Sequence, residues 1–112
     1  MAGTLKRTVG PVALTTTLTT NVYNQGSALI FDVIKHIHVT NKTGTAATFT
    51  LYLGATGANA AGTELFLGQS VAANSSYDWY GNLKVTSTDF LVGGAGTTLA
   101  LVLTAEGEQN VV

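Results

Sequence analysis

The sequence predicts an all-β protein, a single antiparallel β-sandwich or jelly-roll domain. Apolar residues alternate with a period of two in several segments, as in half-buried strands. Turn-forming residues recur about every ten residues, and no segment has the apolar period of about 3.6 that marks an amphipathic helix. A chain of 112 residues fits one domain. We expect residues 1–18 to form an N-terminal arm or edge strand, residues 19–109 the β-sandwich, and residues 110–112 a C-terminal tail.

The first third of the chain supplies three of the expected elements. Residues 9–18 are rich in threonine and contain Pro11, which suits an edge strand or an arm laid across a neighbour. A brief strand follows at residues 20–23, and a turn follows at residues 24–27. Residues 29–40 form the longest candidate strand, with a bend expected near Asp32 and the apolar face Phe31, Val33, Ile37 and Val39.

The rest of the chain alternates between turns and strands. A hairpin turn is predicted at residues 41–44, a flexible loop at residues 54–62 and a turn at the glycine-rich residues 93–96. A strand at residues 47–54 places Phe49, Leu51 and Leu53 on one face. Other short strands are expected at residues 64–67, 77–80, 83–86 and 90–92, and a final strand begins at residue 99.

The composition excludes several classes of function. Charged residues make up 10% of the chain, against about 25% in an average soluble domain, and the net charge is -1. No basic field attracts phosphates, so neither nucleic acid nor an anionic membrane is an expected partner. The chain has no cysteine for a disulfide, a thiolate metal site or a nucleophile. A surface so low in charge predicts coverage by other chains, the alternative being a weakly charged monomer.

The only candidate metal ligands singled out by their spacing are His36 and His38. On a strand they project from the same face about 7 Å apart, which makes an H-x-H metal pair geometrically possible. A site needs a third ligand from a neighbouring strand, such as Asp32, Asp78 or a glutamate, and nothing in the sequence brings one there. The simpler interpretation is a half-exposed polar row, so we predict no metal and no other cofactor.

No motif predicts catalysis. The chain has no G-x-S-x-G nucleophile elbow and no phosphate-binding loop leading into a helix. Its acidic residues are scattered, and Glu106 and Glu108 are interpreted as part of a solvated C-terminal tail. We therefore predict that the protein is not an enzyme.

The aromatic segment of residues 77–80 offers candidate contacts to a partner. On a strand Tyr77 and Trp79 share one face, and Tyr80 lies on the other. One interpretation is a carbohydrate-binding platform or an anchor for a partner chain. The alternative, which we favour for Trp79, is that this side chain fills the core while Tyr80 is free to contact a partner.

Four phrases of the sequence carry a resemblance to a known group. They are IKHIHVTN at residues 34–41, AATFTLYL at residues 46–53, ANSSYDWYG at residues 73–81, and a final alternating strand at residues 99–108 that leads to Gly-Glu. In these phrases the chain resembles small β-sandwich virion structural proteins of tailed bacteriophages. The phrases describe strands and turns, and none of them is catalytic.

The resemblance implies a non-enzymatic structural role in a phage particle. Such proteins serve as capsid decoration (cement) subunits, often as trimers, or as tail and baseplate accessories. We expect a capsid decoration or stabilising subunit, a homo-oligomer with a trimer favoured, whose partners are the major capsid protein or tail proteins. The alternative is a tail or baseplate accessory, including a receptor- or glycan-binding module. The expected location is the virion, after synthesis in the host bacterial cytoplasm without an export signal.

Overall fold

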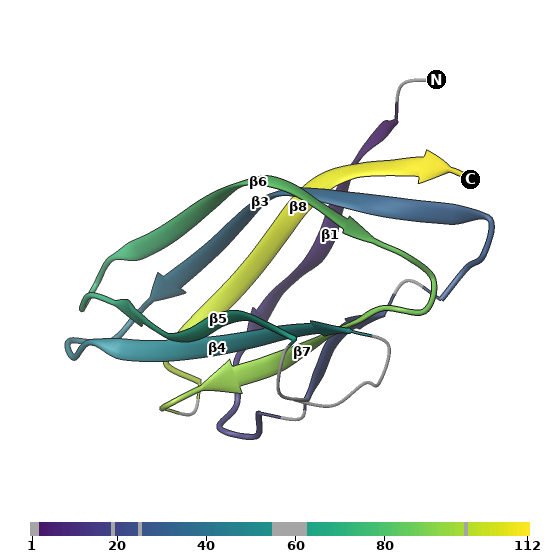
Figure 1. The fold of residues 1–112 in the computed structure, drawn as a ribbon. Coiled ribbons are helices and arrows are strands. Elements are labelled where there is room, and N and C mark those ends of the chain that lie inside the picture. The colour runs from purple at the N-terminus through teal and green to yellow at the C-terminus, as the bar shows by residue number, and fades with distance from the viewer. Residues whose placement is uncertain (1–2, 19, 25, 55–62, 98) are drawn as a thin grey trace.

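Two antiparallel sheets of four strands each form the protein (Figure 1). The structure is a computed structural model that describes residues 3–18, 20–24, 26–54, 63–97 and 99–112. The first sheet has the order β1 (Thr4–Ala13), β8 (Leu101–Val111), β3 (Ile30–Asn41), β6 (Ser76–Val85). The second has the order β2 (Asn21–Asn24), β7 (Phe90–Ala95), β4 (Ala47–Gly54), β5 (Glu64–Val71). The predicted all-β antiparallel sandwich is confirmed.

The core lies between the two sheets. Within each regular stretch of strand, alternate residues point inward, as the period of two requires. Phe49 and Leu51 of β4 are almost fully buried, as predicted for that strand. Tyr77 and Trp79 of β6 pack against the core and are partly buried. The inward face of β6 therefore adds aromatic side chains that pack near Phe49 and Phe66.

A bulge at Lys35 divides β3 into two halves that use opposite residue parities. Before it, Asp32 and Ile34 point inward and are fully buried; after it, Ile37 and Val39 do. Ile34 pairs with Gly107 of β8 but His36 pairs with the adjacent Glu106, so Lys35 is an extra residue. The prediction that Phe31 and Val33 share a face with Ile37 and Val39 was wrong, and the irregularity lies at Lys35 rather than near Asp32.

The turn after β3 is a corner between the sheets, so the predicted hairpin was wrong. The strands it joins, β3 and β4, belong to different sheets. Asn41, which is 1% exposed, holds the corner. Its amide donates to the carbonyls of Thr45 at 2.8 Å and Val71 at 3.1 Å, and its Oδ1 accepts from the backbone N–H of Thr43 at 2.9 Å. A buried amide with three partners can replace backbone pairing where the chain changes sheet.

The glycine-rich segment predicted as a turn belongs largely to β7, which runs to Ala95. Gly93 lies against β4 so closely that a Cβ there would come 2.1 Å from the carbonyl oxygen of Thr50. The glycine is therefore needed for close approach of two strands rather than for a turn. The predicted loop at residues 54–62 lies outside the described residues beyond Gly54.

The first and the last strand both belong to the first sheet. β1 is its edge strand and pairs with β8 from Thr4 opposite Gln109 to Ala13 opposite Val102. Because β8 extends to Val111, the predicted tail at residues 110–112 is strand for most of its length, and Glu106 and Glu108 lie in an interior strand. The two short strands predicted at residues 77–80 and 83–86 are one strand, β6.

Candidate functional site

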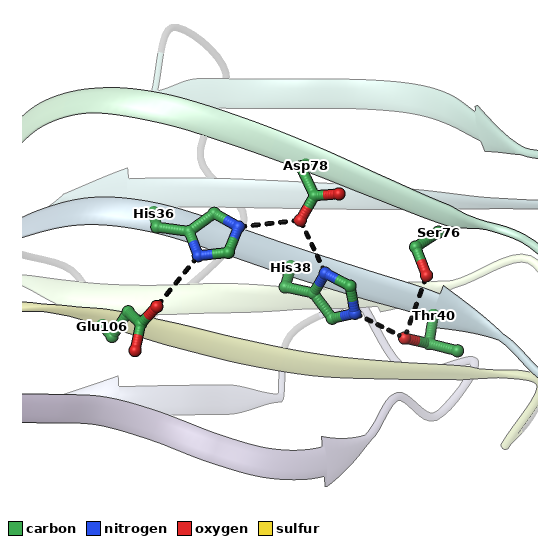
Figure 2. Close-up of polar contacts among 6 residues, drawn as sticks. All are labelled: His36, His38, Thr40, Ser76, Asp78 and Glu106. Carbon is green, nitrogen blue, oxygen red and sulfur yellow. Dashed lines mark hydrogen bonds and ion pairs between the residues drawn. The ribbon is translucent and has the colours of Figure 1, made fainter.

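A cluster of histidines and carboxylates lies on the outward face of the first sheet, across three neighbouring strands (Figure 2). We call His36, His38, Asp78 and Glu106 the outer cluster. The strand register brings them together, because His38 of β3 lies opposite Asp78 of β6, and His36 lies opposite Glu106 of β8. The bulge at Lys35 determines the face, since it turns both histidines outward while residues 32 and 34 point inward.

Both imidazoles converge on one oxygen of Asp78. His36 Nε2 lies 2.7 Å and His38 Nδ1 2.6 Å from Asp78 Oδ1. The nitrogen on the far side of each ring also has a partner. His36 Nδ1 lies 3.0 Å from Glu106 Oε1, and His38 Nε2 lies 2.8 Å from the hydroxyl of Thr40. Each ring is therefore held at both nitrogens, with one edge directed at a shared carboxylate.

The carboxylates favour positive charge between them. The hydrogen bond to Glu106, and then that to Asp78, raise the pKa of His36 despite partial burial, which acts in the opposite direction. The hydrogen bonds from His38 and His36 lower the pKa of Asp78, against a small effect of burial. The cluster is consequently a place where a proton or another cation is stabilised.

Tyr80 covers one side of His36. The two rings stack with their centroids 4.5 Å apart and their planes within 2° of parallel. Tyr80 is 71% exposed, whereas Tyr77 and Trp79 turn toward the core. Of the three aromatic residues named as partner contacts, Tyr80 is thus the one on the outer face. An open depression is lined by His36 together with Leu5, Arg7 and Lys35.

Asp32 does not join the histidines. The structure places it on the inner face, fully buried, where Lys6 Nζ lies 3.3 Å from its Oδ1 and the hydroxyl of Tyr23 donates to its Oδ2. Lys6 Nζ also donates to the Tyr23 oxygen at 3.0 Å. We call Lys6, Tyr23 and Asp32 the inner cluster. Asp32 as a third ligand is excluded, because the bulge puts it on the opposite face of the sheet from His36.

The inner cluster links the two sheets through charge. Burial by itself would lower the pKa of Lys6, but hydrogen bonds to Tyr23 and Asp32 outweigh it, and the net pKa is raised. Burial raises the pKa of Tyr23, and its hydrogen bond to Asp32 raises it further while Lys6 opposes the rise. Lys6 therefore stays cationic and Tyr23 protonated, which is the arrangement a buried carboxylate needs.

The two histidines could be predicted from the sequence as candidate ligands, but the acidic residues that contact them could not be identified. Asp78 and Glu106 lie far from residue 36 in the chain, and only the pairing of β3 with β6 and β8 makes them neighbours. The sequence did place His36 and His38 on one face of a predicted strand and Asp78 on a second predicted strand. It does not contain the register, that is, which residue of one strand lies opposite which residue of the other.

Comparison with family models, with curated proteins and with solved structures found no match to this chain. Within the described part of the chain, no helix has the length and apolar character needed to cross a membrane.

Proposed function

We propose that the protein is a non-enzymatic structural subunit of a tailed-bacteriophage particle, with capsid decoration or stabilisation as its role. The observation that carries the proposal is the surface of the sandwich, which is apolar and weakly charged. The two sheets of the sandwich also end in edge strands. Large apolar side chains are 50 to 85% exposed at seven described positions: Leu5, Leu29, Leu67, Tyr80, Leu99, Val111 and Val112. Such exposure in a chain with 10% charged residues favours burial against other chains.

The ends of each sheet support assembly in the same way. Strands β1 and β6 end the first sheet, and β2 and β5 end the second. An edge strand presents backbone N–H and C=O groups that can pair with another chain. Leu5, which is 85% exposed, lies on the edge strand β1, so apolar surface and free edge coincide there.

The phrases that resemble phage virion proteins fall on the strands of both sheets. Residues 34–41 lie in β3, residues 47–53 in β4 and residues 76–81 in β6.

The strand order also supports the jelly-roll form of the fold. Successive strands alternate between the sheets at every connection except β4 to β5, and the eight strands match the number in jelly rolls. We propose a jelly-roll connectivity on this basis.

The proposed partners are further copies of the chain, in a trimer, together with the major capsid protein. The proposed location is the virion. The alternative, a tail or baseplate accessory that binds a receptor or glycan, is favoured by Tyr80, an exposed aromatic ring that stacks on His36, and His36 lines an open depression. No catalytic role, nucleic acid or membrane partner is part of the proposal.

Sedimentation and electron microscopy test the proposal together. We expect the purified chain to sediment as a trimer, to bind empty capsids of the phage that encodes it and to raise their resistance to heat. A Leu5→Ser, Tyr80→Ser variant should bind more weakly, while a Lys42→Ser variant, changed at the corner after β3, should not. Immunogold label on tails instead of heads would favour the alternative. A monomer that labels no part of the particle would refute both.

A further inference from the structure

His36 of the outer cluster faces an electrostatic problem in its neutral form, because both of its ring nitrogens meet carboxylates. Glu106 is a carboxylate and can only accept a hydrogen bond, so His36 must carry its proton on Nδ1. In neutral His36 the other nitrogen, Nε2, then presents a lone pair to Asp78 Oδ1 at 2.7 Å. Two acceptors at this distance repel unless a proton or a metal ion lies between them.

The second histidine can supply a further donor to the same point. His38 Nδ1 lies 2.6 Å from the same Asp78 oxygen, while its Nε2 meets the Thr40 hydroxyl, which can accept a hydrogen bond from an Nε2–H. When His36 carries its proton on Nδ1 and His38 carries its proton on Nε2, three electron-pair donors face one point. They are two imidazole nitrogens and one carboxylate oxygen. All three ligand atoms lie within 4.8 Å of one another. Such convergence is the donor set of a transition-metal site.

We infer that the outer cluster binds one divalent transition-metal ion, of the class of Zn²⁺, through His36 Nε2, His38 Nδ1 and a carboxylate oxygen of Asp78. Donors at about 2.0–2.1 Å from a tetrahedral Zn²⁺ lie about 3.4 Å apart. The two nitrogen–oxygen separations, 2.7 and 2.6 Å, therefore need to open by less than about 1 Å, which small side-chain rotations supply. Imidazole donors favour Zn²⁺, Cu²⁺ or Ni²⁺ over Mg²⁺ and Ca²⁺.

The surroundings of the ligands match those of a built site. Glu106 holds the Nδ1–H of His36 at 3.0 Å and Thr40 holds the Nε2 of His38 at 2.8 Å, so each ligand ring has an orienting partner. Tyr80 stacks on His36 and fixes the plane of that ring. The three ligands stand on adjacent hydrogen-bonded strands, which restrict their motion. A polar row on a strand requires none of these features.

The coordination would be incomplete with protein ligands alone. The side chains of Asp78 and His38 are 36% and 38% exposed, so the outer side of the site faces solvent. Three protein ligands leave a position open to water or to a group of another chain. The site requires no second chain, so its existence does not depend on the proposed role in a phage particle.

Zinc titration of the full chain after removal of metals by a chelator tests the inference. With Zn²⁺ alone as the probe and a chromophoric chelator as competitor, we expect one ion per chain and no competition from Ca²⁺. Asp78→Asn and His38→Gln should each weaken zinc binding at least tenfold, and Glu106→Gln by roughly tenfold through loss of orientation of His36. Glu108→Gln is the matched control, because it makes the same change two residues along β8 and should bind zinc as the wild type does.

A second measurement separates a metal site from a network of protonated rings. The chain has two histidines, so both imidazole signals can be followed by nuclear magnetic resonance without ambiguity. Zinc should shift both signals in the wild type and in Glu108→Gln, with circular dichroism confirming that the variants are folded. The inference is overturned if no ion binds at one per chain, or if Asp78→Asn and His38→Gln bind zinc as tightly as the wild type.

Discussion

The two polar clusters on β3 differ in where their positive charge comes from. In the inner cluster, Asp32 is fully buried and the chain itself supplies a cation, Lys6, and a hydroxyl, Tyr23. In the outer cluster, Asp78 is exposed and meets two imidazoles, which carry a charge only when protonated. A carboxylate removed from water must have its partners built in, whereas an exposed one can take a proton or an ion from solvent.

One bulge separates these environments. Asp32 and His38 have the same parity on β3, so an unbroken strand would direct both to the same face. The extra residue at Lys35 reverses the facing between them. Gly107 of β8 lies opposite the bulge and lacks the side chain that would keep the strands apart. The same strand therefore contributes one cluster to the core side and one to the surface.

The largest expected effect is on the inner cluster. Lys6→Met removes the cation and leaves the Asp32 carboxylate buried with only the Tyr23 hydroxyl as partner. We expect a loss of about 3 kcal/mol in the free energy of unfolding, measured by urea denaturation. Lys35→Met is the matched control: Lys35 pairs with Glu108 at 3.1 Å on the surface, and its loss should cost less than about 1 kcal/mol. Equal losses in the two variants would contradict the distinction between the clusters.

A smaller effect is expected at the bulge. In Gly107→Ala the new Cβ would lie 1.9 Å from the carbonyl oxygen of Val33, so β3 and β8 must move apart. We expect a destabilisation of roughly 1–3 kcal/mol by thermal or urea unfolding. Gly44→Ala, where a Cβ has no neighbour within 4 Å, should change stability little. If the two alanine variants were equally stable, close approach at Gly107 would not be what maintains the bulge.

Much of the sandwich could be predicted because its signal is local. The alternation of Phe49 and Leu51 with Thr48, Thr50 and Tyr52 predicts β4 and places two apolar side chains on its inner face, where both are buried. The same rule failed over β3, since a bulge shifts parity without changing composition. The turn predicted from the glycines of residues 93–96 failed for another reason, because a glycine needed for strand contact and a glycine needed for a turn look alike in a sequence.

The candidate site was predicted only in part, for a physical reason. His36 and His38 are two residues apart, so their shared face follows from strand geometry alone. Asp78 and Glu106 come from other strands, and their contact with the histidines depends on register. Asp32 is the opposite case. It lies closer in sequence to His36 than Asp78 or Glu106 does, and yet it points to the other face of the sheet.

The smallest expected effect is a dependence on pH that belongs to the inner cluster. The folded pKa of Tyr23 is raised above its unfolded value of about 10, as is that of Lys6 above about 10.5. For a raised pKa the stabilisation is fully present below the unfolded value and is lost as pH rises through the folded one. The difference in unfolding free energy between the wild type and Tyr23→Phe should therefore be constant from pH 8 to about 10 and shrink above it. A difference that grows in alkali would mean that the Tyr23 phenolate is favoured beside Asp32, and that the inner cluster does not depend on a proton held by its own chain.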